Sequence, residues 1–571
     1  MARLALGGTT PRGSDNAVLA LLRASLALLG TAAVLVALLY SGYLNYTDLD
    51  GPEVEVAAET FEVDETGREL RYGRSHLTRD GKIWRLHVQG SPEQIGDARG
   101  RLTARLFEQL DVQVRSRIEE RYSAWLESWT AAMLTRWDYR DADRRLGEPY
   151  RRELAAMAAA MPEAQIDRAS AYHRLFLHQS FDSLTARLDD VVIEGAAFAM
   201  IRKRGGAEPG NLLVGRSLWF DLQHDEELDR LVTVVRADGR YPFVSIGWAG
   251  LVGVVTGVNS RGIFVALDPA RTDDPLEDGA PLPIALRKVL EEADTLEHAV
   301  EILRAAELRT AGIVLVADGP QRKAVIVEMA ARDREDRRVV RGEDELTVWA
   351  TDHLLREPFE SDLQNDWVRR YSSSGYRYDR LGELLGAGGE VDAARVVSIL
   401  RDRRGIDHAE LGLGNPNALE NLRIAQAVVL DATAMVLWVC EGPSALGRFK
   451  AFDLSRLLGR EDLRAAPLED LPADPLLYSE EYRDWLEAIE AIDHARGLLN
   501  RGHPERALIS AQVAHALAPD VGELHRLLGD IERELGHGED AIVHYRRYLE
   551  LVPGRRREQN RVEGIIAELG G

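Results

Sequence analysis

The hydrophobic and polar positions of this chain follow different patterns in successive segments, and the first is a long apolar run. From Ala24 to Leu44 no residue is charged, and about 20 such residues are enough to cross a bilayer. The run is apolar on all sides, unlike the one-sided pattern of a helix packed on a soluble core. It therefore predicts one transmembrane helix over residues 24–44.

The charges beside this run predict its orientation. Arg3, Arg12 and Arg23 precede it, and acidic residues follow it, namely Asp48, Asp50, Glu53 and Glu55. Because positive charge stays on the cytoplasmic side, residues 1–23 are expected in the cytoplasm and the rest of the chain outside it, in a periplasmic setting. A cleaved signal peptide is the alternative, but the run is long for one and no A-x-A site follows it.

The next two segments differ in periodicity. Residues 45–80 are acidic and polar and are expected to form a linker. Residues 81–188 show helical spacing, with Ser91 as a candidate N-cap and Pro92 at the first helical position. We expect a helical lead-in to the domain that follows.

Residues 189–460 are dominated by short β-rich runs separated by Gly and Asp turns, with helical patterns between some of them. Strands gathered into hairpins, with helices set apart from them, favour an α+β sandwich over a doubly wound parallel sheet. This segment is predicted to be the main domain.

Residues 475–571 are helical and contain an internal repeat of 34 residues. Gly502 and His503 recur as Gly536 and His537, and four further positions match, namely Glu505/Glu539, Ala507/Ala541, Leu517/Leu551 and Pro519/Pro553. This period, with small residues at the helix crossing, is typical of tetratricopeptide repeats. We expect the pair to pack on the preceding domain, with residues 558–569 as a capping helix and a protein or peptide as partner.

Composition excludes several functions. The net charge is 71 − 94 = −23, which argues against nucleic-acid binding. Cys440, the single cysteine, lies in an apolar strand-like run and is expected to be a buried thiol. The chain has no GxSxG elbow, no Cys/His cluster and no dinucleotide fingerprint, so we expect no metal and no cofactor.

Several motifs carry a family resemblance from about residue 84 to residue 456. They include "VQGSPEQIGDARGRL", "LLVGRSLWFD", "GLVGVVTGVNSRGIFVALD", "VWATDHLL" and "SGYRYDRLGELL". In their order and spacing this region resembles the acyl-coenzyme A:6-aminopenicillanic acid acyltransferase family and, more distantly, the choloylglycine hydrolases. Both are N-terminal nucleophile hydrolases. The resemblance implies an αββα sandwich and an acyl or amide small molecule in its cleft.

The resemblance also implies a mechanism. In that family the precursor cuts itself and exposes a cysteine at the start of a strand, whose new amino group is the base for its thiol. The corresponding strand start here reads Glu194-Gly195-Ala196, so the nucleophile position falls on Gly195. If the register shifts by one it falls on Ala196, which is equally inert.

Other family positions are partly retained. Arg216 matches the first active-site arginine, but Trp219 stands where the family has an aspartate that holds the amino group, and Asp221 lies two residues away. Asn259 matches the oxyanion-side asparagine, and Arg377 matches the second arginine. Asp352 replaces an asparagine, and a carboxylate would repel a developing oxyanion.

These positions predict a membrane-anchored extracytoplasmic protein with an αββα core that lacks its nucleophile and acts in binding or scaffolding. The alternative is an active amide hydrolase or acyltransferase with a displaced nucleophile, for which the nearest hydroxyls are Ser180, Ser183, Thr185 and Ser217. A third hypothesis treats the core as inert and the repeats as the working surface.

Overall fold

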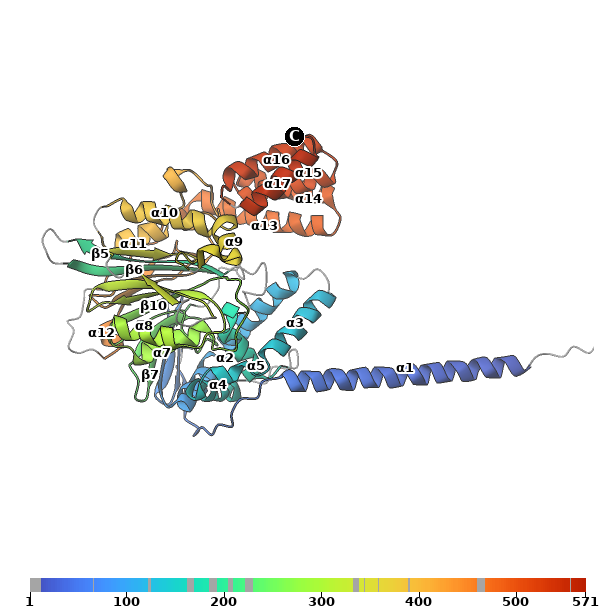
Figure 1. Ribbon diagram of the computed structural model, residues 1–571, viewed down its shortest axis with the longest axis horizontal. Helices are drawn as coiled ribbons and strands as arrows, with labels where there is room; N and C mark the ends of the chain where they lie inside the picture. The colour runs from blue at the N-terminus through green and yellow to red at the C-terminus, as the bar shows by residue number, and fades with distance from the viewer. Residues whose placement is uncertain are drawn as a thin grey trace, which may run out of the picture.

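A computed structural model describes most of the chain. The described residues are 12–64, 66–121, 125–161, 169–183, 193–203, 209–220, 230–331, 338–342, 345–357, 359–388, 391–459, 468–554 and 556–571. Figure 1 shows a layered body with a helical unit at its C-terminal end and a long N-terminal helix that projects away from it.

The N-terminal helix α1 (Arg12–Thr47) contains the run expected to cross a membrane. Residues 22–47 are long and apolar enough to span a bilayer, and no residue of their 18-residue apolar window is buried in the protein. Only the last turns of α1 touch the body: Tyr43 donates to the carbonyl of Met133 at 2.5 Å, and Arg136 donates to the carbonyl of Leu44 at 3.0 Å. The apolar helix is thus present, while its passage through a membrane stays a prediction.

The larger sheet has 11 strands among the described residues. In spatial order they are β1 (Phe61–Val63), β2 (Glu69–Tyr72), β3 (Ser75–Asp80), β4 (Ile83–Gly90), β7 (Arg230–Ala237), β8 (Phe243–Gly247), β9 (Thr256–Asn259), β10 (Ile263–Pro269), β11 (Gly312–Asp318), β12 (Lys323–Met329) and β13 (Arg338–Arg341). Every pair is antiparallel except β4 with β7, which is parallel.

The linker expected over residues 45–80 is therefore only partly a linker, because β1 to β3 extend the edge of this sheet. The sequence gives only a weak indication of these strands, because they are short. Their buried positions, such as Ser75 and Leu77, alternate with less buried ones over only a few residues. Gly73 and Gly81, both at positive φ, close the two turns around β3.

The smaller sheet orders six described strands as β14 (Thr347–Ala350), β5 (Ile193–Lys203), β6 (Pro209–Phe220), β15 (Ile424–Asp431), β16 (Val436–Cys440) and β17 (Phe449–Asp453). Its inner face packs on the larger sheet, since Ala197 and Val214 share one apolar cluster with Val234 and Phe264. Cys440 is buried as predicted, and burial raises the pKa of its thiol to about 11.

Helices cover the outer faces of both sheets (Figure 1). On the larger sheet lie α7 (Leu282–Glu292) and α8 (Leu296–Ala305), and on the smaller sheet lie α10 (Ser374–Gly386) and α11 (Ala393–Leu400). The short helices α9 (Leu363–Tyr371) and α12 (Leu454–Leu457) complete the domain. This order of layers is the αββα sandwich that the sequence predicted.

The helical lead-in consists of α2 (Pro92–Arg121), α3 (Trp125–Tyr139), α4 (Glu148–Ala160) and α5 (Ala171–Gln179). A buried ion-pair network joins it to the sandwich. Arg287 on α7 binds Glu153 on α4 at 2.6 Å and Glu291 at 2.8 Å, and Glu153 also pairs with Arg99 on α2. The lead-in is therefore part of the domain and not a separate module.

The C-terminal region contains α13 (Glu480–Asn500), α14 (Pro504–Leu517), α15 (Gly522–Glu534), α16 (Gly538–Leu551) and α17 (Arg556–Glu568). The first and last residues of α16 each lie 34 positions after those of α14. Gly502 precedes α14 and Gly536 precedes α16, both in the left-handed conformation. Asn415 of the sandwich donates to the carbonyl of Leu551 at 2.6 Å. The helical region thus rests on the loop that leads into β15.

Candidate functional site

Gly195, the expected nucleophile position, lies near the start of β5 between β14 and β6. Its backbone N–H donates to Oδ1 of Asp352, two residues beyond β14, at 2.6 Å. Side chains alternate across a strand, and Ala197 and Ala199 face the larger sheet. Gly195 therefore faces the space between the two sheets.

That space is already filled. A Cβ atom at Gly195 would lie 2.0 Å from Oδ1 of Asp268 and 2.3 Å from Nη1 of Arg216. Both of these side chains are almost fully buried. Even the first carbon of a cysteine or serine side chain has no room at this position.

Arg216 and Asp268 form a buried ion pair that joins the two sheets. Arg216, on β6, donates to Oδ1 of Asp268 and to the carbonyl of Leu267, both on β10. It also donates to the carbonyl of Ser217 at 2.8 Å. The retained arginine therefore has a structural partner on the opposite sheet.

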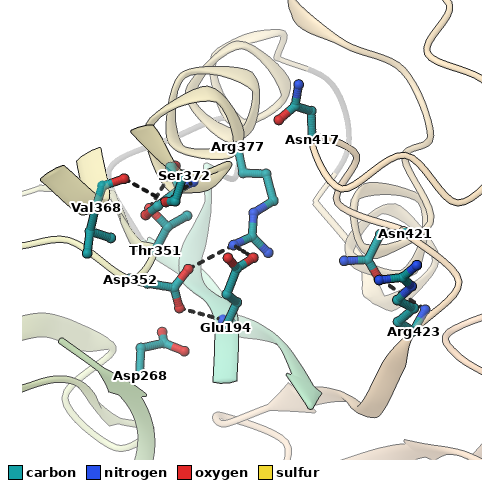
Figure 2. A network of polar contacts seen from close by, with 12 residues as sticks. Glu194, Asp268, Thr351, Asp352, Val368, Ser372, Arg377, Asn417, Asn421 and Arg423 are labelled. Carbon is teal, nitrogen blue, oxygen red and sulfur yellow. Dashed lines mark hydrogen bonds and ion pairs between the residues drawn. The ribbon is translucent and has the colours of Figure 1, made fainter. Parts of the chain in front are cut away.

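Arg377 forms the second half of the cluster, on the other face of β5 (Figure 2). From α10 its Nη2 donates to Oδ2 of Asp352 at 2.8 Å and to Oε2 of Glu194 at 2.5 Å. Trp219 pairs with Glu194 across β5 and β6, so its side chain lies on the same face as Glu194. It stands beside the Glu194–Arg377 pair.

The cluster holds three buried carboxyl groups, Glu194, Asp268 and Asp352, and two buried guanidinium groups. Burial raises the pKa of Asp352 well above its ordinary value; Arg377 lowers it, and the charges of Glu194 and Asp268 raise it further. Burial also raises the pKa of Asp268, against the effect of Arg216. One proton on these carboxyl groups would make the cluster neutral.

This raised pKa predicts a pH dependence of stability. The folded protein holds a proton on Asp352 at pH values where the unfolded chain has lost it, so the free energy of unfolding falls as pH rises from about 4 through the folded pKa. The side-chain amide of the Asp352→Asn variant cannot ionise. Its free energy of unfolding, measured by urea denaturation, should therefore fall less between pH 4.5 and pH 8 than that of the wild type.

The matched control is Asp238→Asn, at an exposed carboxylate in the turn after β7. It should follow the wild-type profile. If Asp352→Asn also follows that profile, Asp352 does not titrate as described.

Asn259, for which the resemblance implied an oxyanion role, does not lie in the cluster. Its side chain donates to the carbonyls of Leu290 and Ala293 at 3.0 and 2.8 Å, and accepts from two backbone N–H groups of its own turn. It lies at the turn end of the β9–β10 hairpin, whereas Asp268 lies at the other end. Asp268 is five positions along β10 from Ile263, a distance of about 17 Å.

Of the proposed displaced nucleophiles, only Ser217 lies beside Gly195 among the described residues, since it pairs with Ala196 across β5 and β6. Ser180 and Ser183 follow α5 in the lead-in, and Ser183 shares a hydrogen bond of 2.7 Å with Tyr139. Ser217 lies on β6, on the face opposite to Arg216. Thr185 and Asp221 lie outside the described residues.

Glu194 and Asp268 are the site residues that sequence reasoning missed. One clue to Asp268 was present, because it ends the apolar run "GIFVAL" of a buried strand, where an acidic residue needs a partner. Glu194 had no comparable clue, since its partner Arg377 is 183 residues away.

Comparisons with known proteins support the resemblance. Residues 220–440 match the family described as acyl-coenzyme A:6-aminopenicillanic acid acyl-transferase. This region includes Asn259, Asp352 and Arg377 but begins after β5, so it does not include Gly195, Arg216 or Trp219. The chain therefore contains an acyltransferase-like region, as its motifs indicated.

The chain is also similar to single proteins. An uncharacterised protein of Archaeoglobus fulgidus is 29% identical over 126 residues, which are 21% of this chain and 21% of that protein, so the match spans about a fifth of the relative's length. A Caenorhabditis elegans N-acylethanolamine-hydrolysing acid amidase orthologue is 17% identical, with a TM-score of 0.29 over 42% of this chain and 93% of the other. A mutant conjugated bile acid hydrolase from Clostridium perfringens is 11% identical, with a TM-score of 0.32 over 49% and 97%.

Proposed function

We propose that the sandwich is a non-catalytic relative of the acyltransferases and acts by binding. One observation carries this proposal: the place of the nucleophile is a glycine whose missing side chain is replaced by the Arg216–Asp268 ion pair. Neither self-cleavage nor attack on a carbonyl is possible from that position.

The test is the intact mass of the purified full chain, followed by assays for amide hydrolysis and for acyl transfer from a coenzyme A thioester. We expect a single species at the calculated mass and no turnover. Two chains with a break between residues 180 and 220 would contradict the proposal, and the new N-terminal residue would identify the nucleophile.

The alternative, an active enzyme with another nucleophile, has one further candidate in the structure. His353 Nδ1 lies 2.8 Å from Oγ of Ser374, next to Asp352. Both side chains are buried, and burial lowers the pKa of His353 to about 3, which makes it too weak a base at neutral pH. Ser217→Ala and Ser374→Ala should therefore behave like the parent in both assays.

For the ligand we propose a small molecule with an acyl or amide group. Among the described residues, the indole N–H of Trp219 and the Nε of Arg377 have no hydrogen-bond partner although both are buried. Buried donors gain most from acceptor oxygens such as a carbonyl. Both belong to side chains beside Glu194.

We also propose that α1 anchors the protein in a membrane, with its main domains on the extracytoplasmic side. The 18 residues from Leu22 to Leu39 would span about 27 Å, close to the hydrocarbon thickness. At the next turns Tyr40 lies near Trp129, and Tyr43 and Tyr46 lie near Trp137 of α3. Tyr and Trp are enriched where a helix leaves the bilayer.

Deleting residues 1–39 should move the protein from the membrane pellet to the supernatant after cell lysis, because the deletion removes the apolar span. The double variant Trp129→Ser/Trp137→Ser in the full chain is the control and should stay in the pellet. Recovery of the intact full chain in the supernatant would contradict the anchor.

We propose that α13 to α17 are two tetratricopeptide repeats with a capping helix, and that they hold a protein or peptide partner. The 34-residue spacing of the α14 and α16 boundaries supports this. Asn415 and Asn417 donate to the carbonyls of Leu551 and Pro553, so the loop that carries them contacts the C-terminal helices. Figure 2 shows Asn417 of this loop near Arg377. A partner bound to these helices would therefore lie next to the loop beside Arg377.

A further inference from the structure

Three histidines from three different helices converge in the C-terminal region. His515 is on α14, His525 on α15 and His544 on α16. Their ring centres are 5.4 Å apart for His515 and His525, 5.4 Å for His525 and His544, and 6.2 Å for His515 and His544. The catalytic resemblance does not involve any of them.

The hydrogen bond of His525 determines which of its ring nitrogens is free. Nε2 lies 2.7 Å from the carbonyl of Pro519, which can only accept, so Nε2 carries the proton. In the neutral ring, Nδ1 then has a free lone pair, and it points at Nδ1 of His544 at 3.2 Å. A carbonyl that holds the distal N–H of an imidazole is the usual support of a metal-bound histidine.

The distances between His525 and His544 match those of two imidazoles that share one metal ion, whereas His515, whose ring centre is 6.2 Å from that of His544, would have to turn toward them to bind the same ion. Zinc binds histidine nitrogen at about 2.0–2.1 Å in a tetrahedron, which puts two ligand nitrogens about 3.3 Å apart and their ring centres about 5 Å apart. Without a metal, two facing Nδ1 atoms can share only one proton.

We propose that His515, His525 and His544 form a binding site for a divalent transition-metal ion, with Zn²⁺ as the expected ion and water as the fourth ligand. Three imidazoles and one open position are a common ligand set for zinc. The site is new relative to the proposed function and does not depend on it.

Two of the three rings are accessible to an ion from solvent. His515 and His544 are partly exposed, and among the described residues His515 has no side-chain hydrogen bond, so its ring is free to turn toward the pair.

A second group of ligands lies nearby and is the rival site. Glu532, His537 and Asp540 have atoms within 4.8 Å of one another, but two of the three are exposed and His537 is already bound to Glu532 at 2.7 Å. Because this group lacks a supporting carbonyl and a third imidazole, we expect weaker binding there.

A metal at the three histidines would join α14, α15 and α16. It would cross the junction between the two helix pairs, which the ion pair of Arg547 with Asp520 at 2.8 Å also joins. An ion that binds the folded form alone stabilises it in proportion to the logarithm of its concentration. The metal would thus make the rigidity of the C-terminal helices depend on metal supply.

The experiment uses the untagged full chain in mild detergent, stripped of metal with a chelator. Isothermal titration with Zn²⁺ is expected to show one tight site per chain. Co²⁺ should give the visible absorption bands of a tetrahedral complex, and the melting temperature should rise with added Zn²⁺. His515→Ala and His544→Ala, at partly exposed positions, should each weaken Zn²⁺ binding at least tenfold.

Two variants serve as controls. His494→Ala removes an exposed histidine of α13, and His537→Ala removes the imidazole of the rival group. Both should bind Zn²⁺ like the parent, and the metal-free circular dichroism of all variants should match it. Absence of a tight site, loss of binding in His537→Ala, or unchanged binding in His544→Ala would overturn the proposal.

Discussion

Replacing Gly195 by cysteine should destabilise the core by about 3 kcal/mol or more and should not create a self-cleaving enzyme. The new Cβ would overlap Asp268 and Arg216, and overpacking costs about 1–3 kcal/mol before the disruption of a buried ion pair is added. Urea denaturation measures the first effect and intact mass measures the second.

The matched control is Gly386→Ala, at the end of α10. A Cβ there meets nothing within 4 Å, so the substitution should change stability by less than about 1 kcal/mol. A Gly195→Cys protein that is as stable as the parent would show that the space beside residue 195 can hold a side chain. A variant that cuts itself before residue 195 would show that this position can act as the nucleophile.

Replacing Arg377 by methionine should cost about 3–5 kcal/mol, because it leaves the buried carboxyl groups of Glu194 and Asp352 without their shared cation. The loss should shrink at low pH, because the raised pKa of Asp352 lets this carboxyl group bind a proton and lose its charge. Urea denaturation at pH 5 and pH 8 measures both effects.

A compensating variant separates charge from packing. Arg377→Met combined with Glu194→Gln and Asp352→Asn removes the uncompensated charge and should recover part of the loss. The control Arg369→Met, at a partly exposed position of α9, should cost less than about 1 kcal/mol. If Arg377→Met costs no more than this control, the cluster does not contribute to stability.

The predicted elements came close to the structure wherever the pattern of apolar residues was strong. The helix expected over residues 24–44 lies inside α1, and the helical spacing seen over residues 81–188 corresponds to α2, α3, α4 and α5. The prediction was poorest at residues 61–80, where strands of three to six residues are too short to show a reliable alternation.

The candidate site could be predicted only in part. Gly195, Arg216, Asp352 and Arg377 lie together, as the resemblance implied, because the strand order of the smaller sheet brings β5, β6 and β14 side by side. Asn259 lies apart from these four residues. A turn motif identifies the residue, but the register of β9 and β10 determines which end of the sandwich it faces.

The sequence by itself determined that this protein contains an apolar helix, an acyltransferase-like region and a 34-residue repeat, and that a glycine stands at position 195, where the resemblance places the nucleophile. These are local properties of composition, periodicity and residue identity. Only the tertiary structure decided that Asp268 and Arg216 occupy the space beside Gly195, that Glu194 shares Arg377 with Asp352, and that His515, His525 and His544 meet. The physical reason is that these contacts join strands and helices far apart in the chain, and the stacking of the two sheets and the packing of the helices set their distances.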